Sequence, residues 1–315
     1  MNTRQKLEII QKTLGLTQTK LADKFGVSFP ALNSWLVGKS KPRAKKDKLI
    51  EDLYLEITGQ KQIPTEDLEK KKRILRYKAL GYKNTVQEII SNPDIRDQFI
   101  LKLTYHSNSI EGSTLTEPDT AAILFNDVAI AQKSLTEHLE AKNHQTALLY
   151  LFDHVFTKQK VDENLILKLH SILMNGIRPD AGVYRNHAVR IVGVNLPTAN
   201  YMSIHKKMTE LMSFLDKEIK KKDCDVISLV TILHSKFEQI HPFSDGNGRI
   251  GRLLMSAMLL TYNIAPAVIR QEKKQLYYTY LYKAQIKEEY SQFEDYFCDA
   301  IMDGYLILER EDGNW

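Results

Sequence analysis

The sequence is poor in cysteine and in long apolar runs. Its 315 residues include two cysteines, Cys224 and Cys298, which cannot form a disulfide framework and lie in no metal-ligand spacing. We expect both thiols to be reduced and structural. The longest apolar run, residues 253–269, contains Ser256 and Pro266, so it predicts a buried helix with an exit turn and not a membrane span. The N-terminus has no apolar signal core, which predicts a cytoplasmic protein.

Strand signals are also scarce, and the common phosphate-binding fingerprints are missing. After residue 65, apolar residues three and four apart predict a mostly α-helical body. The stretch from Val189 to Ile204 begins with β-branched residues and continues with Asn, Pro and Thr, which predicts one β-hairpin. Two roles are open for it, a mobile flap or a decorated connection between helices. The chain has no G-x-x-x-x-G-K-[ST], and helical patterns flank residues 246–248, so neither a P-loop nor a dinucleotide fold is indicated.

The excess positive charge is confined to the start of the chain. Residues 1–60 hold eleven Lys or Arg and six Asp or Glu, a net charge of +5, whereas the other 33 basic and 33 acidic residues cancel. A basic module on a neutral body predicts a polyanion partner for that module. A lysine-rich face that is merely solvated is the alternative.

The first 58 residues predict a small all-α domain. Thr17 and Ser28 are good N-caps for two short helices separated by Gly26, an arrangement typical of a helix-turn-helix. The string LTQTKLADKFGVSFPALNSWLVGKSKPR resembles the Cro/repressor type of DNA-binding domain, which implies that the last of these helices enters a major groove. The candidate DNA contacts are Ser28, Phe29, Asn33 and Ser34, with Arg43, Lys45, Lys46 and Lys48 near phosphates. A helix-turn-helix used only for protein contacts is the alternative.

The stretch HPFSDGNGRIGR, residues 241–252, predicts an anion site. Pro242 ends the preceding helical pattern and a second helix follows the glycines, so the loop lies at a helix N-terminus. Free backbone N–H groups and the positive end of the helix dipole attract anions there. Gly246 and Gly248 let the backbone curl and approach a ligand closely.

Four charged or titratable side chains of this stretch suit a metal-bound polyphosphate. Arg249 and Arg252 are three residues apart, so they project from the same side of the first helical turn toward one ligand. Asp245 suits Mg²⁺ held against phosphates, and His241 suits a general base. Taken singly, each has an ordinary explanation as a helix cap, a turn residue or a surface cation. Their order and spacing favour a single site.

The same string resembles the signature of the Fic family, which transfers AMP from ATP onto protein hydroxyls. The resemblance extends over residues 66–315, behind a linker that Gly and Pro predict at 59–65. It implies a mostly α-helical Fic fold, a helical bundle with a β-hairpin flap. It also implies that His241 deprotonates the target hydroxyl and that Asp245 holds Mg²⁺ against the α- and β-phosphates. The remaining implied phosphate contacts are an anion hole of Gly246, Asn247 and Gly248, support from Arg249, and Arg252 at the γ-phosphate.

Two further segments resemble the family's substrate contacts. GVYRNHAVRIVG, residues 182–193, resembles the segment that leads into the hairpin, whose edge pairs with the target by strand addition. The residues expected to dock the target are Val189, Arg190, Ile191 and Val192. YYTYLYKAQI resembles the stretch that closes over the adenine, with Tyr277 or Tyr278 as the candidate. A tyrosine at helical spacing is equally an ordinary core residue.

The segment SNSIEG, Ser107 to Gly112, resembles the family's inhibitory signature and ends a helix expected at about 97–112. The resemblance implies that Glu111 pairs with Arg252. The pair would remove the cation that holds the γ-phosphate, so ATP would bind only unproductively. An ordinary helix-end glutamate is the alternative reading of this position.

The sequence therefore predicts a protein adenylyltransferase with ATP as co-substrate and Mg²⁺ as cofactor. It would transfer AMP to a Ser, Thr or Tyr hydroxyl of a protein, itself included, and release pyrophosphate under inhibition by Glu111. Two alternatives are removal of AMP from a modified protein and a DNA-bound regulator whose body senses nucleotide. The family resemblance also suggests a homodimer.

Overall fold

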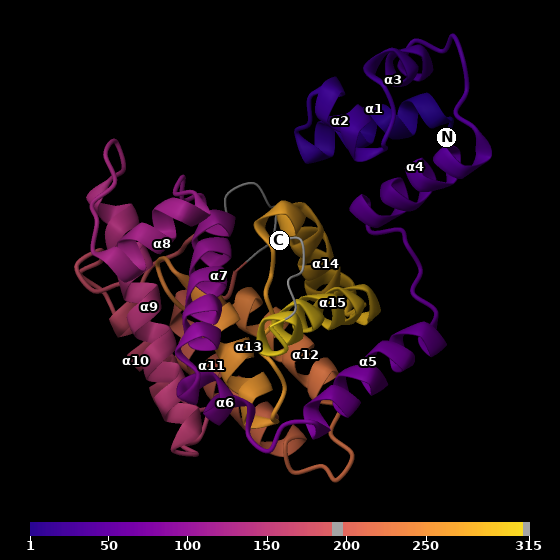
Figure 1. The fold of residues 1–315 in the computed structure, drawn as a ribbon. Helices are drawn as coiled ribbons and strands as arrows, with labels where there is room; N and C mark the ends of the chain where they lie inside the picture. The colour runs from indigo at the N-terminus through magenta and orange to yellow at the C-terminus, as the bar shows by residue number, and fades with distance from the viewer. Residues whose placement is uncertain (191–197, 311–315) are drawn as a thin grey trace.

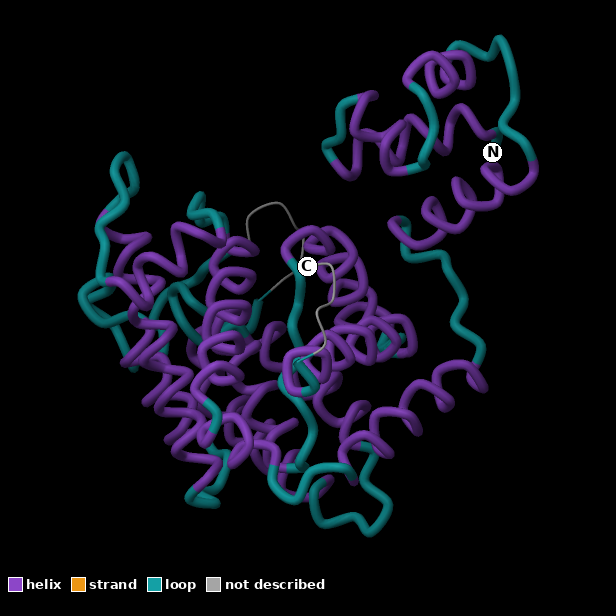
Figure 2. Tube along the Cα trace, in the orientation of Figure 1, coloured by secondary structure: helices purple, strands orange, loops and turns teal. Residues whose placement is uncertain are grey.

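Every regular element that the structure describes is a helix. A computed structural model describes residues 1–190 and 198–310, and within these ranges no residue lies in a β-strand (Figures 1 and 2). Among the same residues, no helix is long and apolar enough to cross a membrane. The expected mostly α-helical class is therefore correct.

The N-terminal domain is a four-helix unit. Its helices are α1 (Thr3–Leu14), α2 (Gln18–Lys24), α3 (Phe29–Leu36) and α4 (Ala44–Ile57). Thr17 Oγ1 accepts the N–H of Lys20, and Ser28 Oγ accepts the N–H of Ala31, so both expected N-caps are formed. The apolar faces of all four helices meet in one hydrophobic cluster that includes Leu7, Leu21, Leu32 and Ile50.

The larger body has a separate hydrophobic cluster. Its first seven helices are α5 (Thr65–Leu80), α6 (Thr85–Ser91), α7 (Pro93–Glu111), α8 (Glu117–Asn126), α9 (Leu135–Phe156), α10 (Glu163–Leu173) and α11 (Ile204–Glu218). The remaining elements are α12 (Val226–Ile240), α13 (Asn247–Thr261), η2 (Gln271–Lys273), α14 (Lys274–Lys287) and α15 (Ser291–Leu308). Helix α13 contacts α7, α9, α10 and α12. Residues 249–260 of α13 are all buried, as expected for a helix that is packed on every side.

The N-terminal domain contacts the body through α14. Figure 1 shows the end of α4 beside α14, and Leu276 of α14 packs against the clusters of both domains. Tyr280 Oη donates to the carbonyl of Glu56 at 3.4 Å, and Lys283 Nζ donates to the carbonyl of Gly59 at 2.7 Å. The segment between α4 and α5 is thereby fastened to the body instead of standing free.

The predicted hairpin has no strand among the described residues. Its expected second extended piece instead forms a 3-10 helix, η1 (Tyr201–Ser203), and Ile204 already begins α11. The strand prediction was wrong here because a helical stripe of apolar residues starting at Ile204 is buried in the body. That stripe consists of Ile204, Met208, Leu211 and Leu215.

The first part of the predicted hairpin is only partly described. Val189 and Arg190 have irregular backbone, whereas Ile191 and Val192 lie outside the described residues. Thr198 Oγ1 donates to the carbonyl of Val189 at 3.1 Å. The described residues on the two sides of positions 191–197 therefore lie close together.

Candidate active site

The loop between α12 and α13 has two residues in left-handed backbone conformation. Helix α12 ends at Ile240, next to Pro242 as expected, and His241 adopts φ 52° and ψ 60°. Gly246, the residue before α13, has φ 79°. The positive φ at Gly246 favours glycine, and a Cβ there would lie 2.2 Å from the flexible end of Met174, Cε, which would have to move.

Side chains from the loop and from α10 hold the loop closed. Asn247 Nδ2 donates to the carbonyl of Phe243 at 2.9 Å, and the N–H of Phe243 donates back to Asn247 Oδ1 at 2.9 Å. The ring of His170 stacks on Phe243, with centroids 3.7 Å apart. The N–H of Gly182 donates to His170 Nδ1, so Nε2 carries the ring proton and donates to the carbonyl of Asp245. Burial lowers the pKa of His170 to about 4, which keeps this tautomer neutral.

His241 is a largely buried, neutral imidazole at the lip of this loop. Burial lowers its pKa to about 4. Its Nδ1 atom has no hydrogen-bond partner within the described residues. A neutral imidazole has one unprotonated ring nitrogen, so it can accept a proton at pH 7 as a general base requires.

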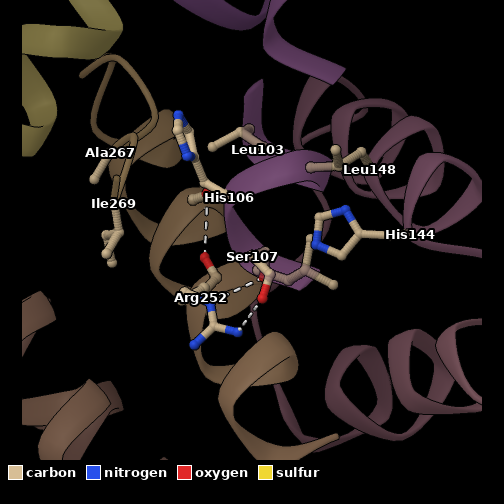
Figure 3. Close-up of a pocket in the computed structure, with 10 residues that line it drawn as sticks. Leu103, His106, Ser107, His144, Leu148, Arg252, Ala267 and Ile269 are labelled. Atoms are coloured by element: carbon tan, nitrogen blue, oxygen red, sulfur yellow. Dashed lines mark hydrogen bonds between the residues drawn. The ribbon is translucent and has the colours of Figure 1, made fainter. Parts of the chain in front are cut away.

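The structure brings Arg252 together with the end of α7. Figure 3 shows the guanidinium facing Ser107: Nε donates to Ser107 Oγ at 2.9 Å, and Nη2 donates to the Ser107 carbonyl at 3.1 Å. Nη2 also donates to Glu111 Oε1 at 2.6 Å. Burial alone would lower the pKa of Arg252, but the Glu111 carboxylate raises it above its ordinary value. Helix α7 ends at Glu111, where Gly112 has φ 109°.

A small cavity lies behind this contact. It holds about 20 Å³ and is lined by Ser107, Arg252 and His144 of α9, among others (Figure 3). His144 Nδ1 lies 3.0 Å from Thr104 Oγ1, and its Nε2 has no partner within the described residues. The volume is sufficient for one water molecule.

Glu111 lies directly over the N-terminus of α13. A Cβ on Gly248 would stand 2.3 Å from Glu111 Oε1 and 3.0 Å from Arg252 Nη1. The missing side chain at Gly248 therefore leaves room for an anion beside the first turn of α13. In this structure the anion in that position is the Glu111 carboxylate, whose side chain is 31% exposed.

The two arginines contact different carboxylates in this structure. Arg249 Nη1 donates to Glu140 Oε1 of α9 at 2.6 Å, and its side chain is 3% exposed. Asp245 Oδ1 lies 3.5 Å from Arg249 Nη2. Glu140, far away in sequence, draws Arg249 toward α9, while Arg252 turns toward α7. Their convergence on one ligand stays a prediction.

One pocket brings together six of the predicted site residues. It has about 100 Å³ of free space and is lined by Glu111, Glu238, His241, Gly248, Arg252, Tyr277, Tyr278, Leu281, Tyr282 and Gln285. Tyr277 is 1% exposed, and its hydroxyl lies 2.7 Å from His234 Nε2, so it is a core residue that also forms the pocket wall. The Arg252 guanidinium lies over its ring, 5.9 Å from the centroid.

Sequence reasoning missed Glu238, which is 6% exposed inside this pocket. Burial, assisted by the charge of Glu111, raises the pKa of its carboxyl to about 8. Its Oε1 atom has no hydrogen-bond partner in the described part of the chain. The available signal was a glutamate in the last turn of α12, three residues before His241.

The candidate DNA contacts lie on the surface of α3. Phe29 is 46% exposed, Asn33 is exposed, and Ser34 Oγ lies 2.7 Å from Ser40 Oγ. Lys46 differs from the expectation, because its ammonium donates to the carbonyl of Phe25 at 2.5 Å and so binds the end of α2. The other basic candidates, Arg43, Lys45 and Lys48, are exposed.

Comparison with known proteins identifies both parts of the chain. Residues 160–259 match the model of the Fic/DOC family, and residues 8–54 match a helix-turn-helix model. A protein adenylyltransferase Fic from Nematostella vectensis is 34% identical over 185 residues, which cover 57% of this chain and 42% of that protein. Its namesake from Drosophila willistoni is 30% identical over 178 residues, covering 56% and 35%. The chain thus matches less than half the length of these curated relatives.

Solved structures agree on the fold. A Fic domain protein from Bacteroides thetaiotaomicron is 24% identical, with a TM-score of 0.65 over 78% of this chain and 95% of that one. Fic-1 from C. elegans is 20% identical, with a TM-score of 0.66 over 95% and 97%. The chain therefore contains a Fic/DOC domain at residues 160–259 and, ahead of it, a helix-turn-helix domain at residues 8–54.

Proposed function

We propose that this protein transfers AMP from Mg-ATP to a protein hydroxyl. The observation that carries the proposal is the pocket in which a neutral His241, the N-terminus of α13 and Arg252 meet. Relatives named protein adenylyltransferase support the same reaction. ATP is the co-substrate, and a Ser, Thr or Tyr side chain of a protein is the acceptor.

The residues have distinct roles in this reaction. His241 takes the proton of the attacking hydroxyl, whose oxygen displaces pyrophosphate from the α-phosphorus in line. The backbone N–H groups at Gly246, Asn247 and Gly248 stabilise the charge that develops on the phosphate oxygens. Arg252 holds the γ-phosphate, and Arg249, whose guanidinium is held by Glu140 of α9, supports the phosphates.

Asp245 suits a magnesium ion that arrives with the nucleotide. Its side chain is 52% exposed, and Oδ2 accepts no hydrogen bond from the described residues. Mg²⁺ in nucleotide sites is commonly held by one or two carboxylates plus phosphates, so a single carboxylate fits. When bound, the ion would neutralise phosphate charge. No cluster of three or more His, Cys, Asp or Glu suited to a metal occurs within the described ranges.

Glu111 is proposed to inhibit the reaction. Its carboxylate pairs with Arg252 and lies beside the first turn of α13, where the proposal places a phosphate. Two anions in one position repel, and Arg252 cannot serve both. ATP would then bind with its γ-phosphate displaced and its α-phosphorus out of line with the acceptor.

The test is self-modification of the full chain by labelled Mg-ATP. We expect Glu111→Gly to raise labelling at least tenfold and His241→Ala on that background to abolish it. Asp97→Gly is the matched control, because among the described residues the ion pairs and hydrogen bonds of this α7 carboxylate are with Arg96 alone. Mass spectrometry should find a gain of one AMP. A gain of one phosphate, or equal labelling with and without Glu111, would contradict the proposal.

Removal of AMP is a second candidate, because Glu111 and His241 line the same pocket. A carboxylate there can orient a water molecule once AMP is attached to a target. Protein labelled through the Glu111→Gly variant and then mixed with unmodified chain would lose its label if this reaction occurs. Retention of the label over the same period would exclude it.

The N-terminal domain is proposed to bind DNA. Support comes from its net charge of +5 within residues 1–60, the exposed N-terminal part of α3 and the helix-turn-helix match. An electrophoretic shift with full chain and mixed-sequence duplex at low salt tests this. No shift even at low salt would favour the alternative of a module for protein contacts. A shift that Asn33→Ala leaves unchanged would assign binding to phosphates alone.

A further inference from the structure

Arg185 is a buried arginine that joins three separate segments of the backbone. Its guanidinium donates from Nε to the carbonyl of His241 at 2.8 Å, from Nη1 to His187 at 2.7 Å and from Nη2 to Ala199 at 2.6 Å. Its own N–H donates to the carbonyl of Pro242 at 3.0 Å. The residue is 3% exposed. One side chain therefore connects the catalytic loop with residues on both sides of Val189 and Arg190.

The charge of Arg185 has no carboxylate partner among the described residues. A buried cation is costly unless it is well hydrogen bonded, and here burial lowers its pKa. The carbonyl oxygens of His241, His187 and Ala199, which accept from the guanidinium, supply that compensation. Lysine cannot replace the arrangement, because its ammonium is a single point with no planar fork.

His241 depends on this contact because its backbone is unfavourable. A non-glycine residue at φ 52° is uncommon and persists only where the surroundings hold it. On one side the N–H of His241 donates to the carbonyl of Phe237, which is part of α12. On the other side the carbonyl of His241 is held by Arg185 Nε. The direction of the imidazole follows from a backbone that these two contacts fix.

We propose that Arg185 is a positioning residue for AMP transfer. It fixes His241 relative to His187 and Ala199, and hence relative to Val189 and Arg190, the described residues expected to dock the target. This proposal rests on the proposed AMP transfer. A residue with a general structural role would change both the transfer rate and the affinity for ATP. Arg185 should change the rate alone, because it does not line the nucleotide pocket. The transfer rate should depend on Arg185, whereas the affinity for ATP should not.

The experiment compares Arg185→Lys and Arg185→Gln in the full chain, both on the Glu111→Gly background. At saturating Mg-ATP we expect the transfer rate to fall about 100-fold, as for a reacting group displaced by about 1 Å. The dissociation constant for Mg-ATP should stay within threefold of its starting value. Arg96→Gln, an arginine on the surface of α7, is the control and should leave the rate unchanged. Parallel losses of rate, ATP affinity and melting temperature would overturn the proposal, and so would an unchanged rate.

Hydrogen exchange provides a readout that does not depend on catalysis. In Arg185→Lys, peptides covering residues 185–190 and 241–246 should both exchange faster, while the peptide from the middle of α12 stays protected. If Glu111→Gly itself transfers no AMP, the proposed function fails, and this exchange pattern still decides whether Arg185 couples the two segments. Faster exchange in only one of the two peptides would overturn the coupling.

Discussion

The two domains differ in whether their buried polar atoms are all hydrogen bonded. Ten buried side-chain nitrogen or oxygen atoms lack a hydrogen-bond partner in the described residues, and all of them lie between residues 108 and 305. Four belong to the site: Glu238 Oε1, His241 Nδ1, Arg249 Nε and Arg252 Nη1. The described N-terminal domain has none. A core with no unpaired polar atom is a scaffold for surface contacts, whereas unpaired atoms around a pocket indicate a ligand that pairs them.

The two domains also differ in their histidine content. All nine histidines lie between residues 106 and 241, and the first 105 residues contain none. Five of them have pKa values lowered by burial: His106, His144, His170, His234 and His241. The body is therefore the part of the molecule whose stability should respond to pH near neutrality.

The largest difference between the domains should appear when a lysine loses its charge. Lys72 of α5 is 3% exposed and pairs with Asp225 and Glu294, whereas the Lys6–Glu51 pair of the N-terminal domain is partly exposed. Lys72→Met should lower the free energy of unfolding of the body by about 3 kcal/mol or more, because two carboxylates lose their cation. Lys6→Met should cost less than about 1 kcal/mol. Calorimetry of both variants measures these losses of stability. Equal losses would contradict the claim that the body depends more on its buried charge pair than the N-terminal domain does on its exposed one.

Acid should weaken the body and spare the N-terminal domain. Each of the five histidines binds a proton near pH 6.5 when unfolded but only near pH 3 to 4 when folded, so the free energy of unfolding falls as pH drops below 6.5. Glu238 acts in the opposite direction, because its folded pKa of about 8 favours folding as pH falls. On balance the unfolded chain binds up to four more protons than the folded chain, because five histidines gain a proton on unfolding and Glu238 loses one. Each such proton changes the free energy of unfolding by at most about 1.4 kcal/mol per pH unit.

Hydrogen exchange at pH 7.0 and pH 5.5, corrected for intrinsic rates, measures this effect in each domain separately. Protection of α12 and α13 should fall, while protection of α1 and α4 should change little. Equal loss of protection in both domains would show that the histidines do not set the response.

The smallest effect should be the same in both domains. Thr17→Ala removes the cap of α2, and Thr116→Ala removes the capping box of α8. Each should cost about 1 kcal/mol, because a capping hydrogen bond is local and independent of the surrounding fold. Chemical denaturation of each variant checks the two values. A cap worth several times more in the body would mean that the domains differ in local helix energetics as well as in buried polarity.

The loop between α12 and α13 shows which features a local sequence pattern can predict. Pro242, Gly246 and the apolar stripes around them predicted a loop between two helices, and the structure has α12 ending at Ile240 and α13 beginning at Asn247. The same pattern could not reveal that Arg249 turns toward Glu140, because that contact spans 109 residues. Only the second extended piece of the predicted hairpin was wrong, because the burial of Ile204 and the helical stripe that follows it favours α11.

The sequence alone determined the helices, their caps and the set of residue types in the motif, because these depend on neighbours three or four positions away. Only the tertiary structure decided which side chains meet. It buried Glu238 beside His241, brought Glu111 over Gly248 and placed Arg185 between His241, His187 and Ala199. Such contacts depend on how α7, α12 and α13 pack. The pKa values that follow from burial are therefore properties of the fold and not of the motif.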